Sequence, residues 1–410
     1  MNRTSAEPHR MDPAGGCPHA ANARLLARGA VAPVVLPGEV EAMAVLGHDT
    51  LREFLTHPDV AKGARHFTAL VEGRIPAGWP PATFATVRGM TTADGDDHRR
   101  LRALVSRAFT PRRVAGLRPR VEELTVALLD DLVRAAAADD GVVDLRRHFA
   151  LPLPLGVISE LLGVDTRHRD RLHHLCNQVV ATGITPAEAV AAHRELVAVL
   201  GEIAAAPGDD LTSALIAARD DDGDRLDAQE LIGTLVLMII AGHETTLNLI
   251  TNAVRALVAH RDQLDLVRAG GASWDDVVDE TLRWDAPVSF FPFRYPVRDL
   301  TLDGTVIPRG TPVPAGYSAA GRDPAGYGPD ADRFDVTRAG RPGAVRNLSL
   351  GHGAHYCLGA PLARLEATVA LERLFGRFRG LDLAMAEDAL PRHAGFVGNS
   401  VGTLPVRLGV

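Results

Sequence analysis

A chain of 410 residues with 46% hydrophobic and 23% charged residues has the composition of an ordinary globular protein. Its net charge of −7 argues against non-specific nucleic-acid binding by the chain as a whole, and three cysteines are too few for a disulfide framework. The basic charge is almost entirely arginine, because Lys62 is the only lysine.

The first 20 residues are polar and rich in Pro and Gly, which predicts a loosely ordered arm. They lack the apolar core of a signal peptide, and the longest apolar run, residues 231–242, is too short to span a bilayer. The sequence therefore predicts a soluble, cytoplasmic protein without a membrane anchor. No low-complexity linker interrupts the chain, so residues 1–410 are expected to form a single domain.

A small β region precedes the helical part of the chain. Residues 34–45 hold short apolar runs divided by Pro-Gly, the pattern of a hairpin or small sheet, and a helical pattern begins at Leu51. Residues 67–92 are irregular, with prolines and glycines among aromatic side chains. A long irregular loop in a compact protein is often a lid or binding loop, and an ordinary surface excursion is the alternative.

Residues 98–120 form a basic segment with eight arginines and no acidic residue. Such a cluster in an acidic protein can be a docking patch for an acidic partner, although any single arginine also suits a solvated helix face. His98 and Arg102 are one helical turn apart and point the same way.

Residues 121–211 are mostly helical by their Ala, Leu and Val periodicity, with breaks at Gly and Pro. His173, His174 and His193 lie in this region. No carboxylate or cysteine arrangement around them predicts a metal site, so we expect surface or core histidines.

A long helix is predicted from a capping box at Asp227 and Glu230 to about Ala259, roughly 48 Å at 1.5 Å per residue. Gly242 weakens this helix locally, and the Thr245 hydroxyl can compete for a backbone carbonyl one turn back. A flat cofactor and a small gas molecule need such a dent, whereas a buried Gly-Thr without a function is the alternative. The residues that share this face are Thr234, Leu237, Met238, Ala241, Gly242 and Thr245.

Two further motifs follow. Glu280 and Arg283 form an E-x-x-R pair on one helix face. The stretch L-G-H-G-A-H-Y-C-L-G-A-P-L-A-R, residues 350–364, places Cys357 in a glycine-rich loop before a helix predicted over residues 358–378. The N-terminus of that helix is expected to lower the thiol pKa, and a thiolate there suits an axial ligand to haem iron. A buried structural thiol and a nucleophilic cysteine are the alternatives.

Four motifs in this order resemble the bacterial, actinomycete-type cytochrome P-450 monooxygenases, and the resemblance covers nearly the whole chain. They are His98 with Arg102, A-G-H-E-T-T at residues 241–246, the E-x-x-R pair and the cysteine loop. The resemblance implies a mainly helical haem-thiolate fold with a small β region, a triangular helical prism whose long distal helix lies over the haem. The chain departs from the family pattern at Leu350, where Phe is usual, and at Ala331, where Pro is usual.

By resemblance, the cofactor is haem b, with Cys357 as the axial ligand of its iron. The propionates are expected on His98, Arg102, Arg294 and His355, and the remaining cofactor contacts are expected from Ala241, Gly242, Leu350, Gly351 and Gly359. The family's buried triad, which locks the scaffold behind the haem, would consist of Glu280, Arg283 and Arg333.

The resemblance also implies the reaction. Thr245 would steady dioxygen with its ordered water, and Glu244 would help deliver the protons that break the O–O bond. This pair favours an enzyme reduced by ferredoxin and ferredoxin reductase, with NAD(P)H used only indirectly. The expected reaction is hydroxylation of a hydrophobic secondary metabolite, steroid or similar small molecule by a monomer.

Candidate substrate contacts are Trp79, Phe84, Met90, Leu237, Met238, Ala241, Val288, Phe291 and Phe396. The region 165–195 resembles the mobile cover of the substrate cavity, and it carries no readable specificity code. Three alternatives stay open: oxidative C–C or C–N coupling of an aromatic natural product such as a cyclic peptide, a non-catalytic haem-binding sensor, and a cysteine hydrolase using Cys357 and His355.

Overall fold

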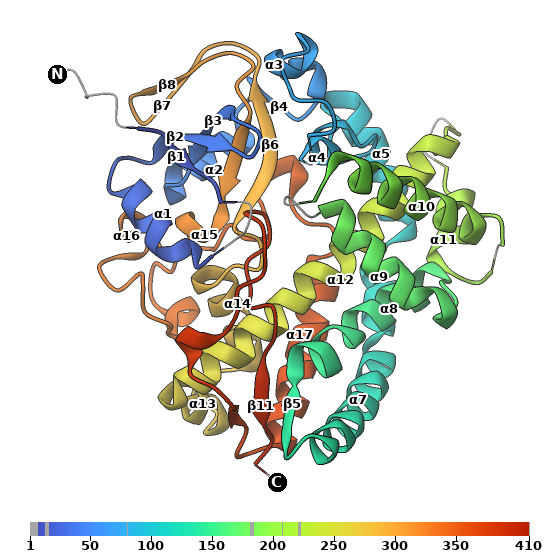
Figure 1. The fold of residues 1–410 in the computed structure, drawn as a ribbon, viewed down its shortest axis with the longest axis vertical. Coiled ribbons are helices and arrows are strands. Elements are labelled where there is room, and N and C mark those ends of the chain that lie inside the picture. The colour runs from blue at the N-terminus through green and yellow to red at the C-terminus, as the bar shows by residue number, and fades with distance from the viewer. Residues whose placement is uncertain are drawn as a thin grey trace.

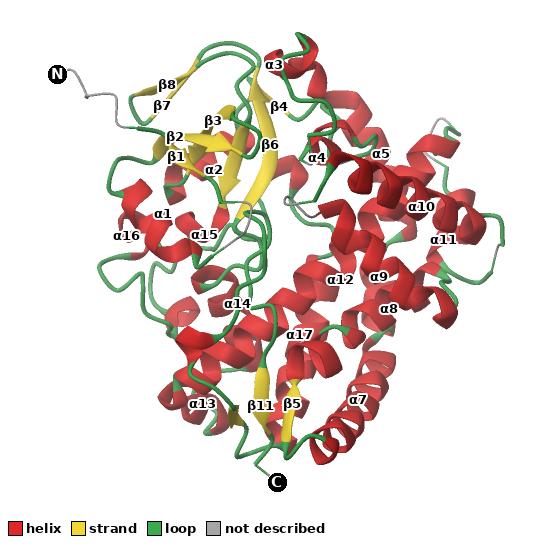
Figure 2. Ribbon diagram, in the orientation of Figure 1, coloured by secondary structure: helices red, strands yellow, loops and turns green. Residues whose placement is uncertain are grey.

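The computed structural model describes residues 7–12, 16–79, 81–180, 184–206, 208–219 and 223–409. Helices fill most of the molecule, and the larger sheet gathers at one side of it (Figures 1 and 2). The mainly helical class with a small β region is therefore confirmed.

The α-helices are α1 (Pro18–Leu26), α2 (His48–Thr56), α3 (Thr68–Val71), α4 (Ala82–Thr86), α5 (Gly95–Ala108), α6 (Pro111–Gly116), α7 (Arg118–Ala138), α8 (Pro152–Leu162), α9 (Thr166–Val180), α10 (Pro186–Ala204), α11 (Leu211–Ala217), α12 (Ala228–Ala259), α13 (Arg261–Arg268), α14 (Trp274–Trp284), α15 (Tyr317–Ala320), α16 (Pro324–Tyr327) and α17 (Ala360–Arg377). The strands are β1 (His9–Arg10), β2 (Val31–Leu36), β3 (Val40–Val45), β4 (Val60–Ala61), β5 (Val142–Asp144), β6 (Phe290–Pro296), β7 (Leu300–Leu302), β8 (Thr305–Ile307), β9 (Val313–Gly316), β10 (Asp382–Leu383) and β11 (Pro405–Arg407).

The long helix α12 crosses the middle of the molecule and packs against α8, α10, α14 and α17 (Figure 1). It starts where the sequence predicts, because the Asp227 carboxylate accepts from the Glu230 N–H at 2.8 Å and the Glu230 carboxylate accepts from the Asp227 N–H at 2.9 Å. Among the single helices of the described residues, only α12 is long enough and apolar enough to cross a membrane. However, 56% of its most apolar window is buried inside the protein, as in the core helix of a globular protein.

The larger sheet has the strand order β1-β2-β3-β9-β6-β4. Strands β2 and β3 form the predicted hairpin, with Val34 opposite Ala42. The expectation of a loosely ordered arm over residues 1–20 is wrong for the part that the structure describes. Strand β1 pairs with β2, and Met11 is buried and donates its N–H to the Val35 carbonyl at 2.8 Å. The reason is that the free edge of β2 offers backbone groups that the N-terminal residues pair with.

The E-x-x-R pair forms a buried clamp on α14. Arg283 donates to both carboxylate oxygens of Glu280, at 2.6 and 2.7 Å, and its other N–H groups bind backbone carbonyls. The predicted third member, Arg333, is exposed and contributes only its carbonyl oxygen, which accepts from Arg283 at 2.7 Å. Arg338 takes that place instead: it is buried, and its Nε lies 3.6 Å from Glu280.

This correction yields a test with a matched pair of variants. Arg338→Met should lower the free energy of unfolding by about 1.5–3 kcal/mol, because it removes charge-assisted contacts to Glu280 and Asp330. Arg333→Met should change it by less than about 0.5 kcal/mol, because the side chain is exposed. Urea unfolding followed by tryptophan fluorescence measures both values, and equal losses in the two variants would contradict the reassignment.

Candidate active site

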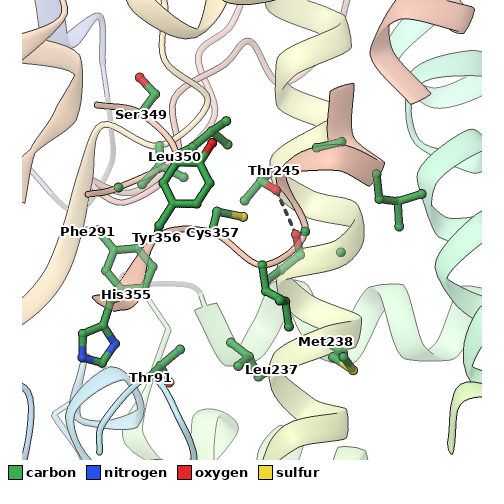
Figure 3. A pocket seen from close by; sticks show the side chains of 18 of the residues that line it. Thr91, Leu237, Met238, Thr245, Phe291, Ser349, Leu350, His355, Tyr356 and Cys357 are labelled. Carbon is green, nitrogen blue, oxygen red and sulfur yellow. Dashed lines mark hydrogen bonds between the residues drawn. The ribbon is translucent and has the colours of Figure 1, made fainter. Parts of the chain in front are cut away.

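A mostly apolar cavity of about 260 Å³ lies between α12 and the loop that carries Cys357 (Figure 3). Its walls come from α5, α8, α12, β6 and α17, so residues far apart in the sequence meet around it. No Asp or Glu is among the described residues that line it. The charged residues that line the cavity are all basic, and the rest of its wall is mostly apolar.

The cysteine loop is held by its own backbone. Gly351 and Gly353 have φ angles of +78° and +73°, which side chains with a Cβ rarely adopt. In addition, a Cβ on Gly353 would lie 2.7 Å from a methyl carbon of Thr56. The Cys357 N–H donates to the Leu350 carbonyl at 2.8 Å, and the sulfur faces the cavity (Figure 3).

The predicted lowering of the thiol pKa is wrong in its net direction. Burial raises the pKa of Cys357, and the N–H groups of Gly359 and Ala360 and the charge of Arg102 offset only part of that rise. The Cys357 side chain is open to the cavity but surrounded by protein, so loss of solvation outweighs the effect of the helix N-terminus. A metal ion would supply the missing positive charge, since a coordinating thiol is deprotonated.

Basic side chains gather at one end of the cavity. His98, Arg102, Arg294 and His355 all line it, as predicted for the propionate-binding residues. The rings of His98 and His355 are 4.0 Å apart, and the Nε2 atom of His98 is buried without a hydrogen-bond partner. Burial and the neighbouring cations lower the pKa of His355 to about 2. Such an excess of cations favours a ligand with carboxylate groups.

Lys62 is a site residue that the sequence analysis missed. It is buried, it lines the cavity, and its Nζ lies 5.0 Å from the centre of the Phe291 ring. Burial, and then the charge of Arg294, lower its pKa well below the ordinary value, while the charge of Asp94 acts in the opposite direction. The sequence does mark this position, because Lys62 is the only lysine in a chain whose other basic residues of this kind are all arginine.

On the opposite wall, α12 presents Ala241, Gly242 and Thr245 to the cavity (Figure 3). The Thr245 hydroxyl donates to the Ala241 carbonyl at 2.8 Å, the bond that the sequence predicts. Helix α12 is continuous here, so the expected dent is not a break in the helix. A Cβ on Gly242 would lie 2.7 Å from a side-chain carbon of Ile158, so this glycine also lets α12 approach α8.

Glu244 does not line the cavity. Its carboxylate is buried on the other side of α12, where Oε1 lies 3.1 Å from His243 and 3.3 Å from His173. Burial alone would raise the pKa of Glu244, but the close contacts with His173 and His243 and the charges of these two residues outweigh it and lower the pKa. The predicted acid therefore sits next to Thr245 in the sequence but behind it in space.

Six of the nine candidate substrate residues line the cavity, and three do not. Those that do are Met90, Leu237, Met238, Ala241, Val288 and Phe291. Trp79 is buried in the core beside the sheet, where its ring stacks on Phe293 at 5.6 Å and its indole N–H donates to the Pro37 carbonyl. Phe84 and Phe396 pack against the same core. The prediction that these three line the cavity is wrong, because the sheet needs their apolar surface.

The cavity residues fit a haem. A sulfur faces a space whose opposite wall is a helix with a glycine and an alanine, and whose basic end could hold two propionates on His98, Arg102, Arg294 and His355. The unpaired Nε2 of His98 supports this assignment. These features define the class of cysteine-ligated haem proteins.

Comparison with known proteins gives the family. A cytochrome P450 family profile matches residues 274–402. The chain is 38% identical to a 2-hydroxy-5-methyl-1-naphthoate 7-hydroxylase of Streptomyces carzinostaticus, over 98% of this chain and 97% of that protein. The chain belongs to the cytochrome P450 family, and it is a haem-dependent monooxygenase.

Solved structures agree. Testosterone-bound CYP154C4 from a Streptomyces species superposes with a TM-score of 0.93 and 41% identity, covering 98% of this chain and 99% of that one. The P450 enzyme CxnD, described as acting in C–S bond formation in chuangxinmycin biosynthesis, superposes with a TM-score of 0.86 and 32% identity. That match covers 100% of this chain and 99% of CxnD.

Lys62 can be tested against the cofactor. Lys62→Met should speed haem loss about tenfold or more, because it removes a buried cation worth roughly 1.5–3 kcal/mol when it binds a carboxylate. Lys62→Arg should keep the charge and lose haem more slowly than Lys62→Met. Transfer of haem to excess apomyoglobin measures these rates, and a wild-type rate in Lys62→Met would show that this lysine does not bind the cofactor.

Proposed function

We propose that this enzyme uses ferredoxin-derived electrons to hydroxylate an apolar, polycyclic small molecule. The observation that carries the proposal is the shared cavity, in which Cys357 and Thr245 face one another across a space walled by apolar side chains. When bound, haem supplies the activation of dioxygen, which the thiolate ligand favours.

The protein's own residues position and supply protons. The Thr245 hydroxyl is fixed on the cavity wall by its bond to the Ala241 carbonyl. The Glu244 carboxylate is a general acid–base group that lies outside the cavity lining, next to His243. To deliver protons to the cavity, it must rotate or act through bridging donors. The apolar walls exclude water, which strengthens the effect of each positioned donor.

The substrate class follows from the lining and from the relatives. Leu237, Met238, Val288 and Phe291 offer apolar contact, and no described carboxylate lines the cavity to bind an amine. One relative acts on a naphthoate, and one structural neighbour holds testosterone. A fused-ring substrate of similar size is consistent with these surfaces.

The electron donor would bind near the cysteine loop. Helix α6 packs against α17, the helix that follows Cys357, and it carries the exposed Arg112. Other arginines of the basic segment already form ion pairs within the chain: Arg100 pairs with Glu230, and Arg120 pairs with Glu160. The docking patch is therefore smaller than the sequence indicates. A cytoplasmic monomer with one domain over residues 1–410 is part of the same proposal.

Oxidative coupling is the second candidate, and it is favoured by one observation: CxnD, described as acting in C–S bond formation, shares the whole fold. Hydroxylation and coupling would use the same cavity with a different substrate pose. Of the aromatic candidate substrate contacts Trp79, Phe84, Phe291 and Phe396, only Phe291 lines the cavity, which weakens the argument for an aromatic-stacking site.

Reduced protein under carbon monoxide tests the ligand. A strongly red-shifted Soret band is expected, because the thiolate donates electron density to the iron. Cys357→Ser should abolish the shift, whereas Cys17→Ser, which changes another exposed cysteine, should leave it unchanged. A band at the ordinary imidazole-ligated position in the wild type would contradict the proposal.

Turnover with testosterone as a probe tests the chemistry. Binding should shift the Soret band, and the product should gain one oxygen atom, whereas coupling would give a product that has lost hydrogen without gaining oxygen. Thr245→Ala should reduce product per NAD(P)H at least about tenfold while consumption of NAD(P)H continues, because proton delivery in the cavity loses its positioned hydroxyl. An unchanged yield of product per NAD(P)H in Thr245→Ala would contradict the role of Thr245. A wild-type protein that binds haem but turns over no substrate would favour the sensor.

A further inference from the structure

A second group of ligating side chains lies behind the haem cavity. His173 from α9 meets His243 and Glu244 from α12. The Nδ1 atom of His173 is 3.1 Å from the Nε2 atom of His243, and the Oε1 atom of Glu244 is 3.3 Å from the first and 3.1 Å from the second. Three potential donor atoms thus form a small, nearly equilateral triangle. None of the three residues lines the haem cavity.

The size of this triangle matches a coordination polyhedron. With bonds of about 2.0–2.1 Å, three ligands of a tetrahedral zinc ion lie about 3.3–3.4 Å apart. The observed separations of 3.1 to 3.3 Å need adjustments of a few tenths of an ångström at most. Two imidazoles and one carboxylate are also a ligand set that zinc uses in proteins, with a fourth position left for water.

The far side of each imidazole is held by a hydrogen-bond partner. His243 donates from Nδ1 to the Ile239 carbonyl at 2.5 Å, which leaves its Nε2 lone pair directed at the triangle. The Nε2 atom of His173 lies 2.9 Å from the Nδ2 atom of the Asn177 amide. With this amide turned over so that its oxygen faces Nε2, His173 donates from Nε2 and its Nδ1 lone pair is free to bind a metal. Such outer partners are what orients histidines at metal sites.

The carboxylate adds an independent observation. Oε1 of Glu244 is buried and has no hydrogen-bond partner among the described residues, although both imidazoles lie close to it. A buried carboxylate oxygen without an aligned donor is rare and calls for a positive group. The buried guanidinium of Arg146 interacts with Glu244 through its charge but is no hydrogen-bond donor to Oε1. Its Nη1 donates instead to Asn248, Thr251 and Ser400. Its positive charge weakens the attraction for a cation but does not block Oε1.

We propose that His173, His243 and Glu244 bind one divalent zinc ion, a metal site separate from the haem. The His173 side chain is 21% exposed, which gives the ion a path from the surface. Zinc bound here would link α9 to α12 and would occupy the carboxylate that the proposed hydroxylation uses as its acid. The binding itself does not depend on that function, so the two proposals can fail separately.

Zinc binding to the haem-loaded full chain tests the site. Tag-free protein is dialysed against EDTA, then equilibrated with increasing Zn²⁺, and the bound metal is measured by mass spectrometry. One zinc per chain is expected. His173→Gln should weaken this binding at least about tenfold, because one of three protein ligands is lost. Glu244→Gln provides a second variant that keeps the shape of the side chain.

His174→Gln is the matched control, because it changes the neighbouring, exposed histidine of the same helix. It should bind zinc like the wild type, and all variants should keep the carbon monoxide spectrum of the wild type, which reports an intact haem site. The proposal is overturned if the wild type binds no zinc, or if His173→Gln and Glu244→Gln both bind it as tightly as His174→Gln does.

Discussion

The helices around the cavity are arranged with respect to one sulfur atom, that of Cys357. Cys357 faces the cavity because its N–H binds the Leu350 carbonyl and because two glycines adopt positive φ angles in the turn before it. Helix α17 then leads directly away from that loop into the core, where it packs against α7, α12 and α14. The opposite wall is formed by the long, uninterrupted helix α12, which offers one continuous face to a flat group. The clamp on Glu280 fixes α14, which also packs against both α12 and α17.

Electrostatics add a second constraint. The cavity brings Lys62, Arg102 and Arg294 together with two histidines, and no described carboxylate lines it. Burying these groups together costs solvation energy in the protein alone, and the same burial and neighbouring cations lower the pKa of His355. The same arrangement pays back when an anionic cofactor enters, because each cation then gains a partner inside a low-dielectric site. Burial of the thiol follows the same logic, since its raised pKa reverses once a metal ion supplies positive charge.

Local signals made much of this architecture predictable. The bounds of α12 could be predicted because a capping box is a contact between residues three apart, and the Thr245 bond reaches only one turn back. The failures concern contacts over long distances in the chain. Arg333 and Arg338 are five residues apart, and only the packed loop shows which of them points inward. Trp79 follows the same rule, because the sheet that buries it combines strands from residues 9–61 with strands from residues 290–316. The contact between His173 and His243 could not be predicted from the sequence, because the two residues are 70 positions apart.

The geometry of α12 itself separates two kinds of chemistry. Successive residues of an α-helix turn by about 100°, so residues 241, 242 and 245 share one side while residues 243 and 244 point to another. The first side faces the cavity and carries the hydroxyl, and the second faces α9 and carries the imidazole and the carboxylate. The Glu244 carboxylate therefore lies outside the cavity lining, next to His173 and His243, whose contacts and charges lower its pKa. The five consecutive residues 241–245 can therefore serve oxygen chemistry on one face and hold a proton or a metal ion on the other.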